Sequence, residues 1–273
     1  MLRCALLLSW GSRMLKGRNA LVTGSTSGIG QGIAEALADQ GVNIMLHGLG
    51  APSEIQAFST SLHDRYGVTV QHAELDLRYT ENVEALTRLA LEHFGTISIL
   101  VNNAGIQHVA PIDQFPVEKW NDILATNLSA SFHTIRTLSA QMKQAGWGRI
   151  INMGSAHALV ASPFKSAYVA AKHGLAGLTK AAALELASSG VTVNTVCPGY
   201  VLTPLVEQQI PDTMRARNMT RQQVEQEVLL AAQPTKRFVS IREIADLVVF
   251  LCSDQARSIT GASLSVDGGW TAQ

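Results

Sequence analysis

The sequence predicts an α/β fold in which helices cover both faces of a parallel sheet. Three observations support this prediction. Short β-branched or apolar runs alternate with longer stretches of helical period. A glycine-rich turn joins the first apolar run to the first helical stretch. The chain has 273 residues, 47% of them hydrophobic, which is enough to bury a large core.

The alternation predicts about seven strands and six main helices. We expect the strands at residues 19–23, 42–46, 68–75, 97–102, 149–153, 191–197 and 264–266. The helices are expected at 30–40, 53–66, 80–94, 120–144, 167–187 and 241–252. Ser240 and Glu243 have the spacing of a capping box, so the last helix should begin there. Parallel strands joined by right-handed crossovers follow from this order.

Two segments stand outside the alternation. Residues 203–236 are polar, rich in glutamine and of helical period, and they follow a predicted strand end. Because ligands bind beyond the carboxyl ends of such strands, we expect this insertion to cover a substrate. Residues 1–13 are expected to be an extension outside the fold, or alternatively a weak organelle-targeting segment, and residues 14–273 a single catalytic domain.

Charge and cysteine content exclude several classes of function. The chain has 21 basic and 21 acidic residues, so we expect no nucleic-acid partner. Its apolar runs are too short to span a membrane. The three cysteines, Cys4, Cys197 and Cys252, form neither a disulfide framework nor a zinc pattern, so we expect no metal and a reducing, cytoplasmic location.

The turn TGSTSGIG at residues 23–30 predicts a dinucleotide site, because glycines let the backbone approach a pyrophosphate at a helix start. The spacing G-x-x-x-G-x-G differs from the common G-x-G-x-x-G, so an ordinary flexible turn is the alternative. The expected cofactor contacts in this turn are Gly24, Ser25, Thr26, Ser27, Gly28, Ile29 and Gly30.

The segment HGLG at residues 47–50 indicates which dinucleotide binds. An acid at this distance from the turn typically bonds a ribose hydroxyl, and an arginine accepts a 2′-phosphate. Neither stands here, so a 2′-phosphate would find no fixed cation and NAD is favoured. We interpret His47 as a surface histidine, with a contact to the cofactor as the alternative.

A tyrosine and a lysine, Tyr168 and Lys172, lie one helical turn apart and therefore on one face. Lowering a tyrosine pKa from about 10 to about 7 takes about 4 kcal/mol. A cation about 4 Å away at an effective dielectric near 20 supplies about that much. We therefore expect Lys172 to lower the pKa of Tyr168, which becomes the general base for an alcohol.

Two further polar residues are candidates for the same site. Ser155 follows a predicted strand, where its hydroxyl can donate to a substrate oxygen as charge develops. Asn127 lies inside a predicted helix. From the residues alone, Asn127 is either part of the site or a buried amide satisfied by backbone groups.

Together, TGxxxGIG, the NNAG of residues 102–105, Ser155, YxxxK and Pro198-Gly199 resemble the short-chain dehydrogenase/reductase family over residues 15–273. The resemblance implies a Rossmann-type doubly wound fold, a nicotinamide cofactor and a homotetramer. It also implies a Ser155-Tyr168-Lys172 triad supported by Asn127, which would hold a proton-relay water. The implied cofactor contacts beyond the glycine-rich turn are Leu49, Asp76, Leu77, Asn103, Ala104, Gly105, Tyr168, Lys172, Pro198, Gly199, Val201 and Thr203.

Within that family, the segments GIQH, SAH, KSAY, TPLVEQQI and VDGGWT resemble bacterial-type D-3-hydroxybutyrate dehydrogenases. That resemblance implies that a substrate carboxylate is held by Gln107, His157, Lys165 and Gln209. Taken singly, a residue such as Lys165 is more often a solvated lysine and one such as His157 more often a structural histidine; only their grouping around the triad favours the substrate role. Tyr200 is also an expected substrate contact, although a tryptophan is usual at this position.

The sequence therefore favours an NAD-dependent oxidoreductase that reversibly converts (R)-3-hydroxybutyrate, a small anionic 3-hydroxy acid, into acetoacetate. One alternative is a reductase of 3-oxoacyl thioesters that uses NADPH. The other is a dinucleotide-binding sensor without catalysis, which would have no need of the three intact triad residues.

Overall fold

The computed structural model describes residues 13–272, so the expectation for residues 1–12 lies outside the described residues. Seven parallel strands form one sheet in the order β3-β2-β1-β4-β5-β6-β7. Their bounds are Asn19–Val22 (β1), Asn43–His47 (β2), Val70–Ala73 (β3), Ile99–Asn102 (β4), Gly148–Met153 (β5), Val191–Pro198 (β6) and Ser263–Val266 (β7). The predicted α/β class and strand count are confirmed.

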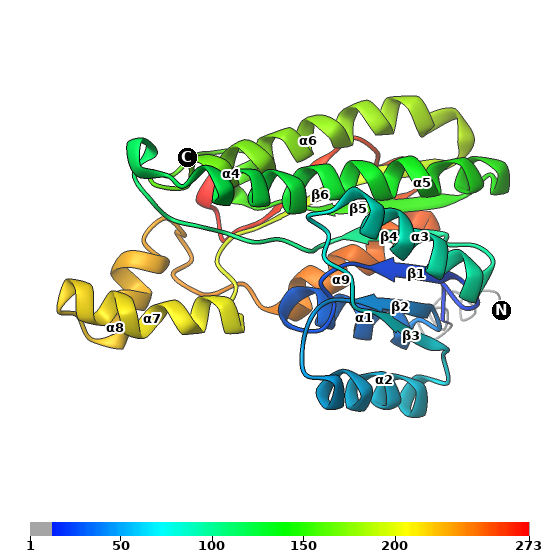
Figure 1. Ribbon diagram of the computed structural model, residues 1–273, viewed down its shortest axis with the longest axis horizontal. Helices are drawn as coiled ribbons and strands as arrows, with labels where there is room; N and C mark the ends of the chain where they lie inside the picture. The colour runs from blue at the N-terminus through cyan, green and yellow to red at the C-terminus, as the bar shows by residue number, and fades with distance from the viewer. Residues whose placement is uncertain (1–12, 273) are drawn as a thin grey trace, which may run out of the picture.

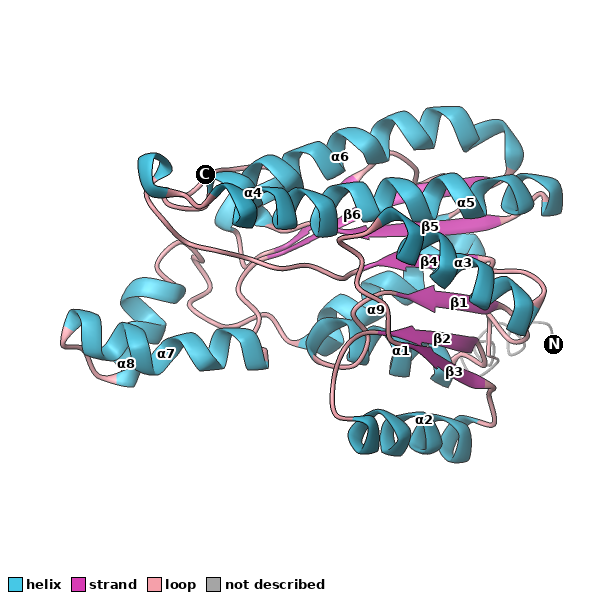
Figure 2. Ribbon diagram, in the orientation of Figure 1, coloured by secondary structure: helices cyan, strands magenta, loops and turns pink. Residues whose placement is uncertain are grey.

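Helices cover both faces of this sheet (Figure 1). One face carries α1 (Gly28–Asp39), α2 (Pro52–Tyr66) and α9 (Ile241–Cys252). The other carries α3 (Thr80–Phe94), α4 (Val117–Leu124), α5 (Ala130–Ala145) and α6 (Ser166–Leu186). Figure 2 shows the strands enclosed between these two helical layers.

Side-chain alternation along the strands explains why both faces are buried. In β1, Ala20 and Val22 belong to the core beneath α1 and α9, whereas Leu21 belongs to the core beneath α3, α5 and α6. Successive residues of a strand point to opposite faces, so a strand covered on both sides must be apolar throughout. The continuous apolar runs of the sequence reflect this double burial.

The strand order places a crevice at the carboxyl end of β1. The chain passes from β1 to β2 and β3 on one side, then crosses to β4 on the other side of β1. In open parallel sheets, ligands bind where the order reverses in this way. The glycine-rich turn, which follows β1, therefore lies at the expected position of a ligand.

Two predicted elements differ from those observed. The third strand is expected at 68–75 but covers only Val70–Ala73, because the Leu75 carbonyl accepts a hydrogen bond from His47 instead of a strand neighbour. The helix expected at 120–144 begins at Val117 and contains a π turn at Ala125–Ser129. A π turn inserts a single residue, which hydrophobic periodicity does not reveal.

The insertion at residues 203–236 is helical, as expected. It forms α7 (Pro204–Arg217), α8 (Arg221–Gln223) and a π turn at Val224–Leu229. In Figure 1 it projects beyond the carboxyl ends of the strands. Ile210, Val224 and Leu229 form a small apolar cluster of its own, against which Tyr200 packs. The insertion thus stands over the edge of the sheet where ligands bind.

The described helices offer no candidate for a membrane span, since none within residues 13–272 combines the required length with sufficient apolar character.

The capping box at the start of α9 is confirmed and carries a stability prediction. Ser240 Oγ accepts a hydrogen bond from the Glu243 amide at 3.2 Å, and a Glu243 carboxylate oxygen accepts one from the Ser240 amide at 2.7 Å. Ser240→Ala should lower the free energy of unfolding by about 1 kcal/mol and the melting temperature by about 2–4 °C. Ser240→Thr keeps the acceptor and should stay near wild type; equal losses in both variants would contradict the cap.

Candidate active site

The glycine-rich turn after β1 has a backbone that only glycine adopts easily. Gly24 and Gly28 have φ values of +61° and +56°. A Cβ atom on Gly30 would lie 2.2 Å from the Gly24 carbonyl oxygen. The turn is also tied to the end of β4, because Asn103 Nδ2 donates to the carbonyl of Gly24 at 2.9 Å. The turn is therefore compact and held at the start of α1, where exposed amides suit a phosphate.

His47 is not the surface residue that the sequence suggested. Its side chain is 4% exposed, and it accepts a hydrogen bond from the Gly24 amide at 3.2 Å through Nδ1. Its Nε2 donates to the Leu75 carbonyl at 2.8 Å. Burial is the largest cause that lowers the pKa of His47 below 6.5. His47 is buried because the parallel sheet brings the carboxyl ends of β1, β2 and β3 together.

The Ser25 side chain is turned into the protein interior. It is fully buried, and its hydroxyl accepts a hydrogen bond from the His47 amide at 3.0 Å. Thr26 and Leu49 lie on the open side, where Thr26 Oγ1 donates to the Leu49 carbonyl at 2.9 Å. Any contact of Ser25 with a cofactor would therefore be through its backbone.

A cleft of about 730 Å³ opens above the turn. Among the residues predicted to bind a cofactor, those that line it are Gly24, Thr26, Ser27, Gly28, Ile29, Leu49, Asp76, Leu77, Asn103, Ala104, Gly105 and Thr203. A glycine-lined helix start beside an elongated cleft fits a dinucleotide, with the pyrophosphate at α1 and the adenosine near Asp76.

The cleft also contains cations that the sequence did not point out. Arg78 and Lys119 line it. The Arg78 guanidinium already pairs with Asp76 at 2.6 Å and with Asp122 at 3.3 Å. This pairing holds the pKa of the Asp76 carboxyl below its ordinary value. The expectation that no cation stands near the adenosine end is therefore corrected, although the charge of Arg78 is largely compensated by its two carboxylate partners.

The end of β5 positions Ser155 and His157. The Ser155 hydroxyl accepts a hydrogen bond from the His157 amide at 3.2 Å and thereby starts a short 3₁₀ turn at Ala156–Ala158. His157 Nε2 lies 2.9 Å from the Ser162 hydroxyl. Burial, with Lys165 nearby, lowers the pKa of His157 to about 4, so the ring is neutral at ordinary pH. His157 is thus buried but still borders the site.

Tyr168 and Lys172 lie in the first two turns of α6. Lys172 is 4% exposed, its Nζ donates to the Met153 carbonyl at 2.7 Å, and Nζ lies 5.5 Å from the centre of the Tyr168 ring. Burial lowers the pKa of Lys172 to about 8. The same helix face therefore brings both side chains to the end of β5, as their spacing predicted.

The pKa of Tyr168 moves in the direction opposite to the one expected. Burial raises it above 10, and a hydrogen bond with Ser155 only partly offsets this. Desolvation of a phenolate outweighs the stabilisation that we assigned to Lys172 from distance alone. The side chains of the site by themselves therefore keep Tyr168 protonated.

Asn127 lies in the π turn between α4 and α5 and is 1% exposed. Its Oδ1 accepts from the Ile106 amide and its Nδ2 donates to the Ile106 carbonyl, both at 2.9 Å. The side chain is thus satisfied by the backbone of the segment that follows β4. It holds in place the segment that carries Gly105 and Gln107.

A smaller pocket of about 140 Å³ adjoins the cleft and contains the predicted substrate contacts. The two hollows share Ile29, Gln107 and Thr203. The other predicted site residues that line the pocket are Ser155, His157, Lys165, Tyr168, Pro198, Gly199, Tyr200 and Val201. The backbone of Gln209 belongs to α7, but its side chain lies outside what the structure describes.

Lys165 is half-buried rather than solvated, and aromatic rings connect it to His157. Its Nζ donates to the Tyr200 hydroxyl at 3.4 Å. The Tyr200 ring stacks on Trp270 at 5.5 Å, and Trp270 meets His157 edge-on at 5.0 Å. Sequence reasoning missed Trp270 as a site residue. Its place just beyond β7, the last strand end, was the signal that could have identified it.

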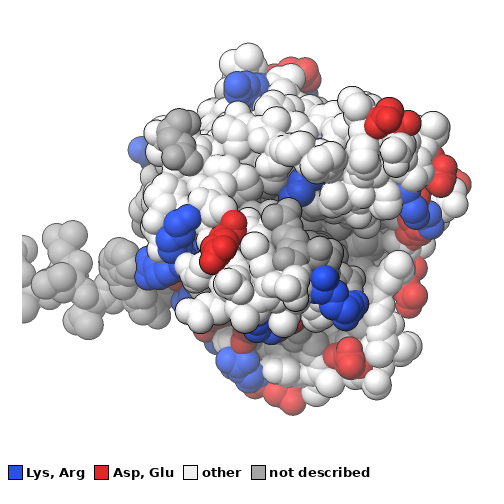
Figure 3. Space-filling view, turned by 90° about the vertical axis from the view of Figure 1, so that its left-hand side faces the viewer, with Lys and Arg blue, Asp and Glu red and all other residues white. Residues whose placement is uncertain are grey.

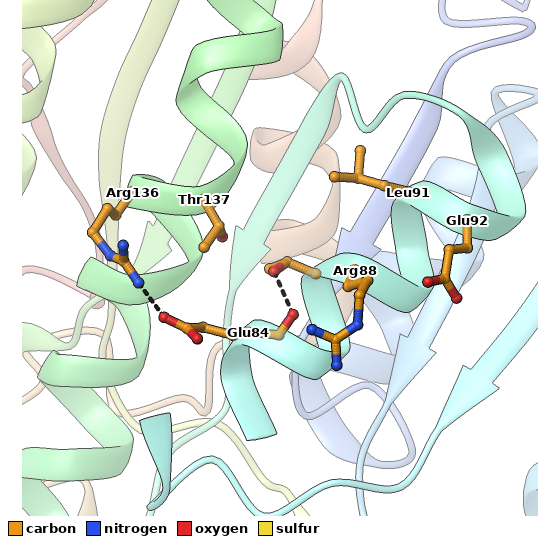
Figure 4. A pocket seen from close by; sticks show the side chains of 7 residues that line it. Glu84, Arg88, Leu91, Glu92, Arg136 and Thr137 are labelled. Atoms are coloured by element: carbon orange, nitrogen blue, oxygen red, sulfur yellow. Dashed lines mark hydrogen bonds and ion pairs between the residues drawn. The ribbon is translucent and has the colours of Figure 1, made fainter. Parts of the chain in front are cut away.

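Figure 3 views the end of the molecule that bears α7 and α8, where charged groups of both signs are dispersed among uncharged residues. An open hollow of about 510 Å³ lies between α3 and α5, lined by Glu84, Arg88 and Arg136 (Figure 4), and shares no residue with the site. In the part of the chain that the structure describes, no group of three His, Cys, Asp or Glu suits a metal ion.

Comparisons with known proteins agree with this geometry. A family model described as enoyl-(acyl carrier protein) reductase matches residues 24–271. A D-beta-hydroxybutyrate dehydrogenase of Rhizobium meliloti (strain 1021) is 55% identical over 256 residues, covering 94% of this chain and 99% of the relative. One from Cupriavidus necator is 50% identical, covering 95% and 100%.

Among solved structures, an actinorhodin polyketide ketoreductase variant with NADPH superimposes with a TM-score of 0.87 at 32% identity, covering 94% of this chain and 98% of that chain. The match to the family model, the alignments with the two relatives and the structural superposition each extend over nearly the whole chain. The chain therefore belongs to the short-chain dehydrogenase/reductase family.

Proposed function

We propose that the chain is an NAD-dependent dehydrogenase that reversibly oxidises (R)-3-hydroxybutyrate to acetoacetate. The observation that carries the proposal is the small pocket that Lys165 lines together with Ser155 and Tyr168. A buried carboxylate needs a fixed cation, and a hydroxyl next to Tyr168 needs a proton acceptor. A short 3-hydroxy acid satisfies both requirements at once.

The pocket dimensions support a short acid over a long thioester. Its volume of about 140 Å³ is far below the several hundred Å³ that drug-sized ligands occupy. Lys165 has no function for an uncharged acyl thioester. The names of the relatives at 55% and 50% identity, both D-beta-hydroxybutyrate dehydrogenases, support the same substrate class.

The residues of the site divide the chemistry between them. Ser155 donates to the substrate oxygen, and Tyr168 as phenolate takes the hydroxyl proton. Lys165, with Gln107 and Gln209, orients the carboxylate, and neutral His157 supports Ser155. The bound cofactor supplies the hydride acceptor and, in its oxidised form, a positive charge. Lys172 is the second positive charge near Tyr168, and the two charges together make the phenolate more favourable than Lys172 alone does.

NAD is the cofactor we propose. The positions beside the end of β2, Gly48 and Leu49, carry no charge, and His47 is neutral. Arg78 is already paired with two carboxylates, so a 2′-phosphate would have to displace one of them. We further propose a homotetramer in the cytoplasm, where Cys197 and Cys252 remain as the buried free thiols found in the structure.

The direct test is an initial-rate assay at 340 nm. NAD or NADP is combined with (R)-3-hydroxybutyrate, (S)-3-hydroxybutyrate or a neutral secondary alcohol. We expect rapid oxidation of the R acid alone. Its initial rate with NAD should be at least about tenfold higher than with NADP. Activity confined to NADP and thioester substrates would contradict the proposed cofactor and substrate. The absence of activity with every pair would refute catalysis.

Lys165→Met should raise the KM for (R)-3-hydroxybutyrate roughly tenfold to 150-fold, because a hydrogen bond to a charged group contributes about 1.5–3 kcal/mol. The KM for a neutral ketone or alcohol should change much less. Lys180→Met, on the exposed side of α6, is the matched control. Equal effects of Lys165→Met on charged and neutral substrates would contradict the carboxylate contact.

The raised pKa of Tyr168 predicts a pH dependence whose sign differs between the two directions. Oxidation needs the phenolate, so kcat/KM should rise about tenfold per pH unit below that pKa, whereas reduction needs the phenol and should stay level there. Tyr168→Phe should lower both rates by about 10²–10⁴-fold and remove the slope. A variant that keeps the wild-type slope would show that another group is the base.

A further inference from the structure

We propose that His47 is a positioning residue for the dinucleotide, whose neutral imidazole holds two walls of the cofactor cleft at a fixed separation. One wall is the glycine-rich turn and the other is the connection from β3 to α3. This inference rests on the proposed binding of a nicotinamide dinucleotide. It goes further by assigning a function to a residue that lines the cleft and hydrogen-bonds both walls.

The hydrogen bonds of His47 define a single tautomer. The Leu75 oxygen is a carbonyl and can only accept, so Nε2 carries the ring proton in the 2.8 Å contact. Nδ1 is then the unprotonated nitrogen, and it accepts the Gly24 amide at 3.2 Å. Both ring nitrogens are thus hydrogen-bonded, Nε2 as the donor and Nδ1 as the acceptor.

Each wall carries residues that face the cofactor. Gly24 lines the cleft, and its carbonyl is also bonded to Asn103, another lining residue. Leu75 lines the cleft and immediately precedes Asp76. The backbone of residue 47 reinforces the link, because the Ser25 amide donates to its carbonyl at 2.8 Å. A change at His47 would therefore move both the pyrophosphate turn and the adenosine wall.

The charge of the ring determines whether the link forms. A doubly protonated imidazole would direct an N–H at the Gly24 amide, where no acceptor remains. Burial keeps the ring neutral and lowers its pKa, so protonation requires a pH below 6.5.

The other titratable groups near the ring are few. His72, on β3, lowers the pKa of His47 further, and Asp76 raises it. Arg78 is paired with Asp76. Residues 24–30 of the turn contain no charged side chain. Hydrogen bonds from Arg78 lower the pKa of Asp76 from its ordinary value, so Asp76 is ionised at neutral pH.

The test measures the Kd for NAD by titration calorimetry between about pH 5 and pH 7.5, with circular dichroism to verify folding at each pH. In the wild type, the affinity should fall only at a pH low enough to protonate His47, which burial places below 6.5, because the Gly24 bond is then lost. His47→Phe removes both bonds and should weaken NAD binding about tenfold at neutral pH, the effect of one buried hydrogen bond. The KM for NAD should rise more than kcat falls.

His47→Asn distinguishes positioning from simple packing. The asparagine oxygen takes the place of Nδ1, accepts the Gly24 amide and does not titrate. This variant keeps the Gly24 link and loses the Leu75 link, so its Kd for NAD at neutral pH should lie between those of the wild type and His47→Phe, and it should lose the acid dependence. His72→Asn is the matched control on the neighbouring strand, where His72 Nε2 bonds the Gly48 carbonyl at 2.9 Å. It should retain an acid dependence, displaced to higher pH because His72 lowers the pKa of His47.

Three results would overturn the inference: wild-type affinity for NAD in His47→Phe, a wild-type acid dependence that His47→Asn retains, or the loss of that dependence in His72→Asn. Failure of the proposed function is distinguishable from all of these. In that case the wild type would bind neither NAD nor NADP at any pH. If the wild type binds NADP alone, the same four proteins are compared with that nucleotide and the same outcomes apply.

Discussion

A chain of buried side-chain hydrogen bonds holds together the strand ends on which the site depends. Asn102 at the end of β4 donates to Asn152 on β5 at 2.9 Å, and Asn152 donates to Thr179 on α6 at 2.8 Å. Thr195 on β6 reaches the same Thr179 oxygen at 2.7 Å. Leaving one of these buried polar groups without a hydrogen bond would lower the stability of the fold by about 1–3 kcal/mol. The network therefore favours a single arrangement of the strands against α6. That arrangement brings Tyr168 and Lys172 of α6 to Ser155 at the end of β5.

Burial at this junction also sets the charges of the site. It raises the pKa of Tyr168, lowers that of Lys172 to about 8 and lowers that of His157 to about 4. Tyr168 and His157 are therefore neutral at ordinary pH, in keeping with the cost of desolvating a charge, whereas Lys172 stays mostly protonated. Lys165, half-buried at the pocket, is placed differently, because it contacts the Tyr200 hydroxyl and remains open to an incoming anion. The proposed substrate and cofactor would supply the charges that this site lacks, which makes catalysis conditional on their binding together.

The elements that complete the site come from both ends of the chain. The glycine-rich turn follows the first strand, whereas Trp270 follows the last. Asp267 builds the turn before Trp270 by accepting hydrogen bonds from the amides of Gly269 and Thr271, each at 3.0 Å. Trp270 then stacks on Tyr200, which also packs against the helical insertion. The Tyr200 ring thus joins Trp270 to the helical insertion.

The sequence by itself determined the α/β class, the seven strands, the capping box and the shared helix face of Tyr168 and Lys172. All of these follow from periodicity or short spacing, which are local properties of the chain. Its motifs also indicated the family, whereas the roles assigned to individual site residues stay predictions. Only the tertiary structure decided that His47 is buried, that Asn127 bonds the Ile106 backbone, that Trp270 borders the pocket and that the pKa of Tyr168 is raised. Each depends on contacts or desolvation produced by segments far apart in the chain, which no local pattern records.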